Sequence, residues 1–262
     1  MTSPDQTPEL THARFAGKRV LVTGGARGIG AATARAFHAE GATVAVGARS
    51  MASYEEFLRD AGPGRYVPAI GALSTQAGCK AVVDGAVAAL GGLDVLVNSA
   101  GVYAEVAFED VDEAHWRETI DINLLGTFFA SQAAMPALRA AHGTIVNLGS
   151  DAGLVGASNA PAYAASKGAV VNLTRALAVA TAQTVRVNCV CPGFVWTDMV
   201  EAAALASGDY DSYAAAARAH SPMQRVGTAD EVATAILYLA SDAAAFINGV
   251  ALPIDGGGIA GY

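Results

Sequence analysis

The sequence predicts an α/β protein: one doubly wound domain, with a seven-stranded parallel sheet and helices on both of its faces. Short runs rich in β-branched residues recur along the chain, and they lack the polar alternation of half-exposed strands. Stretches with a helical period separate these runs, an order typical of parallel strands joined by crossover helices. We expect the strands within residues 18–25, 42–49, 65–73, 93–101, 142–150, 185–193 and 249–257.

Helical periods fill the connections between these strands. The first helix follows the glycines near residue 28 and should stop at Gly41, because glycine readily ends a helix. The connections stay short until the Ala-rich and polar segment 194–227, which we expect to form a substrate lid. No linker divides the chain, so residues 15–262 should form the domain and residues 1–14 a flexible N-terminal arm. Further helices are expected around 75–90, 112–140, 161–182 and 228–240.

Composition and charge exclude several classes of protein. The net charge is −8 and no stretch concentrates Lys and Arg, so we expect neither nucleic acid nor an anionic membrane as a partner. Apolar residues make up 53% of the chain, but no run is long enough to span a bilayer, and the N-terminus lacks the pattern of a signal peptide. Three cysteines form neither a disulfide framework nor a metal site. A cytoplasmic protein without metal is expected; the cysteines are Cys79, Cys189 and Cys191.

A glycine-rich turn, "TGGARGIG" at 23–30, lies between the first predicted strand and the first helix. Gly24, Gly28 and Gly30, with Ile29 between the last two, would let the backbone approach a pyrophosphate at the positive end of that helix. The spacing is G-x-x-x-G-x-G. Its place in the first strand–helix unit predicts a dinucleotide site.

Two arginines indicate which dinucleotide binds. A chain that binds NAD usually ends its second strand with Asp or Glu for the ribose 2′-hydroxyl, whereas this strand ends in Ala48 and Arg49. A guanidinium there can bind a 2′-phosphate in a bidentate manner, and Arg27 in the glycine turn can add a second cation. The sequence therefore favours NADP(H).

Seven motifs, in order and in register, resemble the classical short-chain dehydrogenase/reductase family. The resemblance covers about residues 15–258 and implies a Rossmann fold and NADP(H)-dependent oxidoreductase activity. The motifs are "TGGARGIG" (23–30), "NSAG" (98–101), "DINLLGTFF" (121–129), "IVNLGSDAG" (145–153), "YAASK" (163–167), "PGFVWTDM" (192–199) and "IDGG" (254–257).

The resemblance implies a catalytic tetrad. Tyr163 would be the general acid/base, Lys167 its electrostatic partner, Ser150 the group that holds the substrate oxygen, and Asn123 the residue that positions a water beside Lys167. Physical chemistry supports the central pair, because residues i and i+4 share one helix face. A nearby ammonium would also lower the pKa of a phenol from its usual value of ~10.

The resemblance assigns further residues to the cofactor and leaves one departure. The nicotinamide would present its B face, with pro-S hydride transfer. The usual acidic residue after the third strand is missing, and Ala72 or Gly71 occupies its place. Besides the glycine turn, Arg27, Ala48, Arg49, Tyr163 and Lys167, the implied cofactor residues are Asn98, Ala100, Gly101, Pro192, Val195 and Thr197.

Apolar residues after the sixth strand indicate the class of substrate. With Ser150 and Tyr163, the side chains of Phe194, Trp196, Met199 and Leu205 predict an apolar pocket without an arginine. This pattern favours interconversion of a neutral, moderately hydrophobic ketone and a secondary alcohol. Two alternatives remain: a 3-oxoacyl carrier-protein reductase, and a non-catalytic NADP-binding regulatory or scaffold protein.

The helices around 112–140 and 161–182 are apolar around much of their circumference. Members of the family pair these helices between subunits. A homotetramer, or failing that a dimer, is therefore expected.

Overall fold

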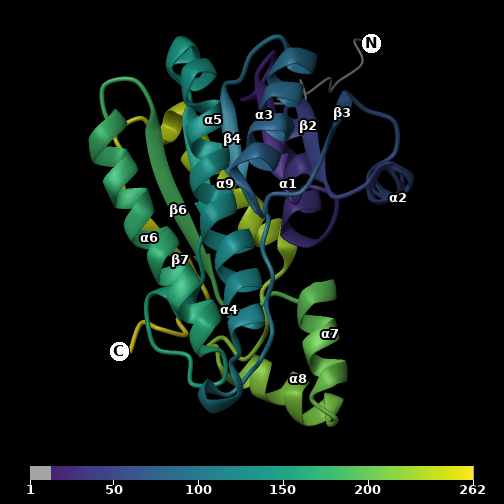
Figure 1. Ribbon diagram of the computed structural model, residues 1–262, viewed down its shortest axis with the longest axis vertical. Coiled ribbons are helices and arrows are strands. Elements are labelled where there is room, and N and C mark those ends of the chain that lie inside the picture. Colours follow the sequence, from purple (N-terminus) through teal and green to yellow (C-terminus); the bar gives the residue numbers. More distant parts are fainter. Residues whose placement is uncertain (1–12, 262) are drawn as a thin grey trace, which may run out of the picture.

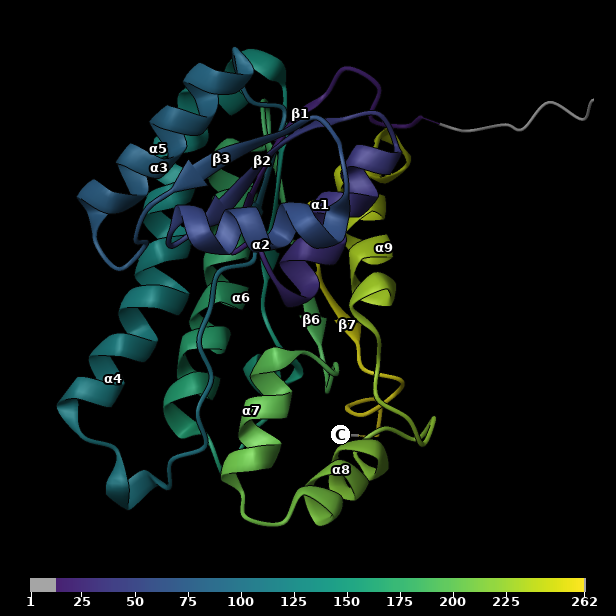
Figure 2. The ribbon, with the colours of Figure 1, turned by 90° about the vertical axis from the view of Figure 1, so that its right-hand side faces the viewer.

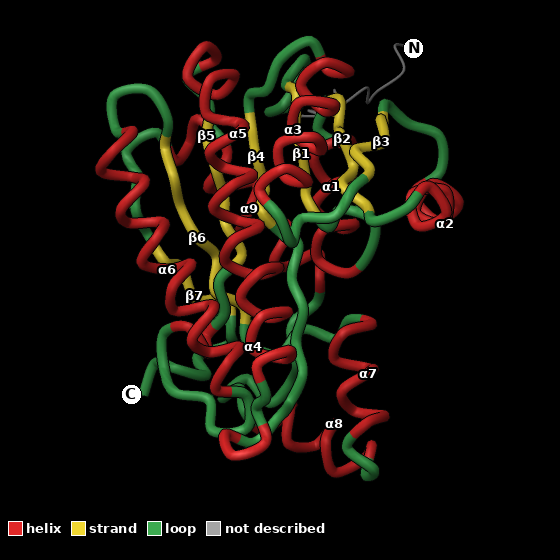
Figure 3. Tube along the Cα trace, viewed as in Figure 1, coloured by secondary structure: helices red, strands yellow, loops and turns green. Residues whose placement is uncertain are grey.

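The computed structural model describes residues 13–261, so the arm predicted for residues 1–14 lies almost wholly outside the described residues. Seven parallel strands form one sheet in the order β3-β2-β1-β4-β5-β6-β7, which confirms the predicted fold class (Figures 1 and 3). The chain builds the sheet outward from β1 in both directions: β2 and β3 lie on one side of β1, and β4 to β7 lie on the other. The strands are β1 (Arg19–Thr23), β2 (Thr43–Ala48), β3 (Tyr66–Ile70), β4 (Val95–Asn98), β5 (Thr144–Leu148), β6 (Arg186–Pro192) and β7 (Ala251–Ile254).

Helices cover both faces of the sheet. One layer contains α3 (Gln76–Leu90), α5 (Gly126–Ala141) and α6 (Pro161–Thr181), and the other contains α1 (Gly28–Ala39) and α9 (Ala229–Ala240) (Figure 2). Successive β1 side chains point to opposite faces. Leu21 accordingly packs in the apolar cluster with α3 and α5, whereas Val20 and Val22 pack in the cluster with α1 and α9. This double burial explains why the strands lack polar alternation.

The helix predictions are confirmed with two differences. The predicted helix 112–140 is divided into α4 (Glu113–Ile120), a π-helical turn (Asp121–Leu125) and α5. Turns of this kind interrupt α-helices at functional sites, and this one contains Asn123. The helix α2 (Met51–Ala61) was not predicted, although Ser50 caps it by accepting from the Ser53 N–H. Short 3₁₀ turns occur at Phe108–Asp110, Asp151–Gly153 and Asp242–Ala244.

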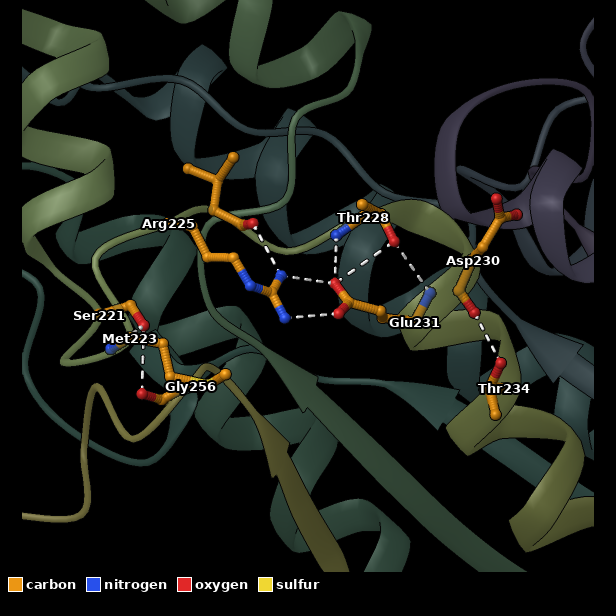
Figure 4. A network of polar contacts seen from close by, with 9 residues as sticks. Ser221, Met223, Arg225, Thr228, Asp230, Glu231, Thr234 and Gly256 are labelled. Carbon is orange, nitrogen blue, oxygen red and sulfur yellow. Dashed lines mark hydrogen bonds and ion pairs between the residues drawn. The ribbon is translucent and has the colours of Figure 1, made fainter.

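The segment 194–227 forms two helices, α7 (Asp198–Ala206) and α8 (Tyr210–Ala219), at one end of the sheet (Figure 1). Its two ends meet, because Val195 and Gly227 form a parallel bridge and the Gly227 N–H donates to the Phe194 carbonyl at 2.9 Å. Figure 4 shows how the returning chain is fixed: both nitrogens at the end of Arg225 donate to the Glu231 carboxylate. The segment is therefore anchored at its base.

Within residues 13–261, no helix combines the length and apolar character needed to cross a membrane. The same residues contain no group of His, Cys, Asp and Glu arranged to hold a metal. All three cysteines are buried and unpaired by disulfides.

Candidate functional site

A cavity of about 1400 Å³ lies at the carboxyl ends of the strands. It begins at the glycine turn between β1 and α1, passes Ser150 and Tyr163, and ends against the segment 194–227. Crevices outside the strand ends, where the strand order reverses, are the usual ligand sites of open α/β sheets.

The glycine turn is shaped by two close backbone contacts. A Cβ atom on Gly24, which has φ +61°, would lie 2.7 Å from the Ala100 Cα, and one on Gly30 would lie 2.1 Å from the Gly24 carbonyl oxygen. Neither position tolerates a side chain. Arg27, at the start of α1, provides no side-chain cap. The first turn of α1 therefore presents backbone N–H groups to an anion, as a dinucleotide pyrophosphate requires.

The end of β2 forms a cationic corner in the same cavity. Arg27 and Arg49 line it, as predicted, together with Ala48. Arg35 of α1 also lines it and was not predicted. Two carboxylates of α2, Glu56 and Asp60, belong to this wall as well.

Tyr163 and Lys167 lie one turn apart on α6 and face the cavity together. The Lys167 ammonium lies 5.6 Å from the centre of the Tyr163 ring and donates to the Leu148 carbonyl at 2.9 Å. Asn123, in the π-helical turn, is buried nearby; a Cβ on Gly101 would lie 3.2 Å from its Oδ1 and 3.6 Å from the Lys167 Nζ. Asn123 and Lys167 therefore lie close together beside Tyr163, and Ser150 lines the same cavity as Tyr163 and Lys167.

The expected lowering of the Tyr163 pKa by Lys167 is not observed. Burial raises the pKa of Tyr163 to about 12; the nearby Ser150 hydroxyl opposes this shift, and the charge of Asp151 adds to it. Burial also lowers the pKa of Lys167 to about 8. Removal from water disfavours the charged form of both groups, and it is the largest cause of both shifts. Tyr163 therefore holds its proton more tightly than a solvated tyrosine, and Lys167 holds its proton less tightly than a solvated lysine.

Ser150 and Asn123 have their hydrogen bonds already defined. The Ser150 hydroxyl donates to Asp151 Oδ1 at 2.9 Å. Asn123 Nδ2 donates to the Val102 carbonyl and to Ser166 Oγ, both at 3.0 Å, and its Oδ1 accepts from the Val102 N–H at 2.8 Å. These contacts fix the amide between α6 and the loop after β4. Its predicted role in positioning a water stays a prediction.

The remaining predicted residues divide into those that line the cavity and two that do not. Asn98 lies outside the cavity: it is buried and its Nδ2 donates to Ser131 Oγ and Asn147 Oδ1, so it braces β4. Leu205 was expected in the substrate pocket, but it is 67% exposed on α7 and does not line the cavity. The predicted residues that do line the cavity include Gly28, Ile29, Ala100, Gly101, Pro192, Val195, Thr197, Phe194, Trp196 and Met199, together with Gly71 and Ala72.

Two side-chain pairings at the substrate end were not predicted, although residues 102–105 and 194–213 were expected to contact the substrate. Glu105 Oε1 accepts from Tyr103 and Tyr213, at 2.7 and 2.9 Å, and the Tyr103 ring lies edge-on to the Tyr163 ring at 4.9 Å. The second pairing joins Asp151 to His220 at 2.8 Å. Glu105 and Tyr213 are 108 positions apart, and Asp151 and His220 are 69 apart. No local motif could have indicated either pairing.

The similarity to known proteins agrees with this geometry. Residues 24–258 match the family model described as enoyl-(acyl carrier protein) reductase. Over 249 residues the chain is 39% identical to 2-(S)-hydroxypropyl-CoM dehydrogenase 3 of Xanthobacter autotrophicus, covering 93% of this chain and 97% of that protein. It is 40% identical over 248 residues to cis-4-hydroxycyclohexanecarboxylate dehydrogenase of Sinomonas cyclohexanicum, with the same coverage of 93% and 97%.

The solved structure of levodione reductase is similar with a TM-score of 0.88 at 33% sequence identity, covering 95% of this chain and 100% of that one. Its fold, the matched family model and the two dehydrogenases all agree with the seven motifs found in the sequence. The chain therefore belongs to the short-chain dehydrogenase/reductase family of nicotinamide-dependent oxidoreductases.

Proposed function

We propose that the protein is an NADP(H)-dependent oxidoreductase that interconverts a neutral, moderately hydrophobic ketone and a secondary alcohol. The observation that carries this proposal is the single cavity that joins the glycine turn to Ser150, Tyr163 and Lys167. Tyr163 exchanges a proton with the substrate oxygen, Ser150 holds that oxygen, and Lys167 contacts the nicotinamide ribose. The bound nicotinamide would supply or accept the hydride. General acid/base groups of this kind contribute rate factors of about 10²–10⁴.

The preference for NADP(H) is supported by Arg27 and Arg49. Both guanidiniums line the cavity where β2 ends, and no carboxylate follows β2 directly. Arg35 adds a third positive charge to this wall, against the two carboxylates Glu56 and Asp60. A 2′-phosphate fits a guanidinium in bidentate geometry better than an adenosine 2′-hydroxyl does.

A neutral substrate is supported by the side chains at the other end of the cavity. This end is lined by the apolar side chains of Phe194, Trp196, Met199 and Val155. The charge of Asp151, which also lines it, is paired with His220. Trp196 also contacts α7 and α8: its indole N–H donates to Glu201 at 2.8 Å, and its ring lies edge-on to Tyr210 at 5.9 Å. Segment 194–227 would act as the lid over this end, and the hydrogen bond from Tyr213 to Glu105 connects it to the loop that follows β4.

The net charge argues against the alternative of a 3-oxoacyl carrier-protein reductase. The matched family model carries an acyl carrier protein in its description. Carrier proteins are acidic, however, and a net charge of −8 with few lysines disfavours docking of such a partner. The alternative of a non-catalytic NADP-binding protein is disfavoured by the intact set Ser150, Tyr163, Lys167 and Asn123.

A homotetramer in the cytoplasm remains our expectation for assembly and location. Trp116 on α4 and Phe128 on α5 are 44% and 40% exposed, and a partner subunit would cover them. Light scattering tests this expectation, and a monomer would refute it.

The direct test is a panel of ketones and secondary alcohols assayed with both NADPH and NADH. We expect NADPH oxidation with moderately hydrophobic neutral ketones and at least about tenfold lower kcat/KM with NADH, the cost of losing one charged contact. Turnover of acyl carrier-protein substrates alone would support the first alternative. Cofactor binding without any turnover would support the second.

A further inference from the structure

Asp151 and His220 connect the catalytic serine to the segment 194–227, and the roles proposed above do not use them. His220 Nε2 lies 2.8 Å from Asp151 Oδ2. The other oxygen of the same carboxylate, Oδ1, accepts the Ser150 hydroxyl at 2.9 Å. A chain of polar contacts thus runs from an imidazole, through a carboxylate, to the group that should hold the substrate oxygen.

Both members of this chain are held in place by their surroundings. Asp151 begins the 3₁₀ turn Asp151–Gly153, its side chain is 13% exposed, and its Oδ1 also accepts from the Ala152 N–H at 2.7 Å. His220 follows α8 directly, and its ring packs edge-on against Phe194 at 5.3 Å. The His220 side chain is 36% exposed, so water can deliver and remove its proton.

Asp151 and a ketone substrate would compete for the one hydrogen bond that the Ser150 hydroxyl can donate. A serine hydroxyl has one hydrogen to donate, and an ionised carboxylate only accepts. While Ser150 donates to Asp151, it can accept from an alcohol or from Tyr163, but it has no hydrogen for a carbonyl oxygen. Binding of a ketone through Ser150 therefore requires that Asp151 release this hydrogen.

We propose that His220, acting through Asp151, decides whether Ser150 donates a hydrogen bond to a ketone or accepts one from an alcohol. This inference rests on the proposed function. A protonated imidazolium forms a charge-assisted hydrogen bond with Asp151 and frees the Ser150 hydrogen for a carbonyl oxygen. When the imidazole is neutral, the Asp151 carboxylate accepts the Ser150 hydrogen. The Ser150 oxygen is then available to accept a hydrogen bond from an alcohol. His220 and Asp151 are thus positioning residues that favour ketone binding at low pH and alcohol binding at high pH.

The other charged and titratable groups around this pair have different partners. The Asp255 carboxylate, from the turn after β7, accepts from the Gly257 and Ile259 N–H groups. Lys167 of α6 donates to the Leu148 carbonyl, and Arg218 of α8 is exposed. The contact with Cys189, together with burial, keeps the pKa of the Cys191 thiol above its usual range, and the raised pKa of Tyr163 keeps that phenol neutral between pH 6 and pH 8. Histidine is the residue type whose charge ordinarily changes between pH 5 and pH 8.

The test compares wild type with His220→Gln and Asp151→Asn, and with His142→Asn as a control. Gln and Asn preserve hydrogen bonding without a titratable charge, and His142 is an exposed left-handed residue that asparagine replaces without strain. Calorimetry measures binding of a ketone to the enzyme saturated with NADP⁺, where no turnover can occur, between pH 6 and pH 8. Steady-state kcat/KM for ketone reduction and alcohol oxidation is measured over the same range.

In wild type and His142→Asn we expect ketone affinity to fall about fivefold from pH 6 to pH 8, the worth of one hydrogen bond. In His220→Gln and Asp151→Asn the affinity for the ketone should change less than about twofold between pH 6 and pH 8. Equal pH dependence in all four proteins would overturn the inference and leave the pair a structural contact. If ketone binding depends on pH in the wild type and not in the two variants, but no protein turns a substrate over, only the proposed function is refuted. If no ketone binds at any pH, both the proposed function and this inference are contradicted.

Discussion

The two ends of the cavity are built in different ways. At the cofactor end the walls are backbone: Gly24 and Gly30 pack directly against Ala100 and against each other, with no room for a side chain. At the substrate end the walls are joined by side chains, with Glu105 reaching Tyr213 and Asp151 reaching His220. Backbone contacts demand particular residues in a fixed local order, whereas side-chain contacts can be made by many residue pairs. The first end is therefore rigid and general, and the second is adjustable and specific to this chain.

The largest effect is expected where an atom is added to the backbone end. In Gly30→Ala the new Cβ would lie 2.1 Å from the Gly24 carbonyl oxygen, so the turn must open. We expect the Kd for NADPH, measured by fluorescence titration, to rise about 100-fold. Gly85→Ala on α3 is the matched control, since its Cβ would contact nothing within 4 Å. Equal NADPH affinity in the two variants would show that the turn is not the pyrophosphate site.

A smaller effect is expected at the cationic corner. Arg49→Ala should raise the KM for NADPH about 10- to 100-fold through loss of a charge-assisted phosphate contact, and should leave the KM for NADH within about twofold. Arg59→Ala, on the exposed side of α2, is the control. A similar rise for both cofactors would assign Arg49 to the shared part of the dinucleotide and remove the argument for NADP(H).

At the substrate end, Glu105→Ala removes the acceptor shared by Tyr103 and Tyr213. The hydrogen bond that joins this loop to Tyr213 of α8 is lost, so we expect the KM for substrate to rise about 3- to 10-fold while kcat changes less than about threefold. Glu109→Ala, in the same loop, should leave both constants unchanged. A fall in kcat alone would place Glu105 in the chemistry and not in closure of the segment 194–227.

The smallest effect concerns stability. The pKa of Lys167 is about 8 in the folded protein, against an ordinary value of 10.5 for a solvated lysine, because burial disfavours its charge. Between these values the unfolded chain holds a proton that the folded chain lacks, so this residue makes the free energy of unfolding rise with pH. Urea unfolding between pH 8 and 9.5 should show a slope lower in Lys167→Met than in wild type, by at most about 1.4 kcal/mol per pH unit. The exposed Lys80→Met should leave the slope unchanged.

The sequence predicted the elements whose residues are constrained locally. The seven strands, the glycine turn and the Tyr163–Lys167 pair were found because burial on both faces, close backbone approach and one helical turn each leave a short-range pattern. The π-helical turn around Asn123 was not predicted, since its geometry depends on the Val102 backbone and Ser166.

The substrate end escaped prediction for the same reason. Leu205 was expected in the pocket because apolar residues near a site usually line it, but α7 turns this side chain to the surface. The expected lowering of the Tyr163 pKa considered only the charge of Lys167, and the desolvation that reverses its direction depends on the packed site.

The central claim, that Tyr163 exchanges the substrate proton in a cavity shared with the dinucleotide, is tested most directly by Tyr163→Phe. NADPH oxidation with the best ketone of the panel and NADPH affinity are measured on the same protein. We expect kcat to fall at least about 10³-fold while the Kd for NADPH stays within about threefold, because only the acid/base group is lost. Retention of more than about a tenth of wild-type kcat would contradict the claim.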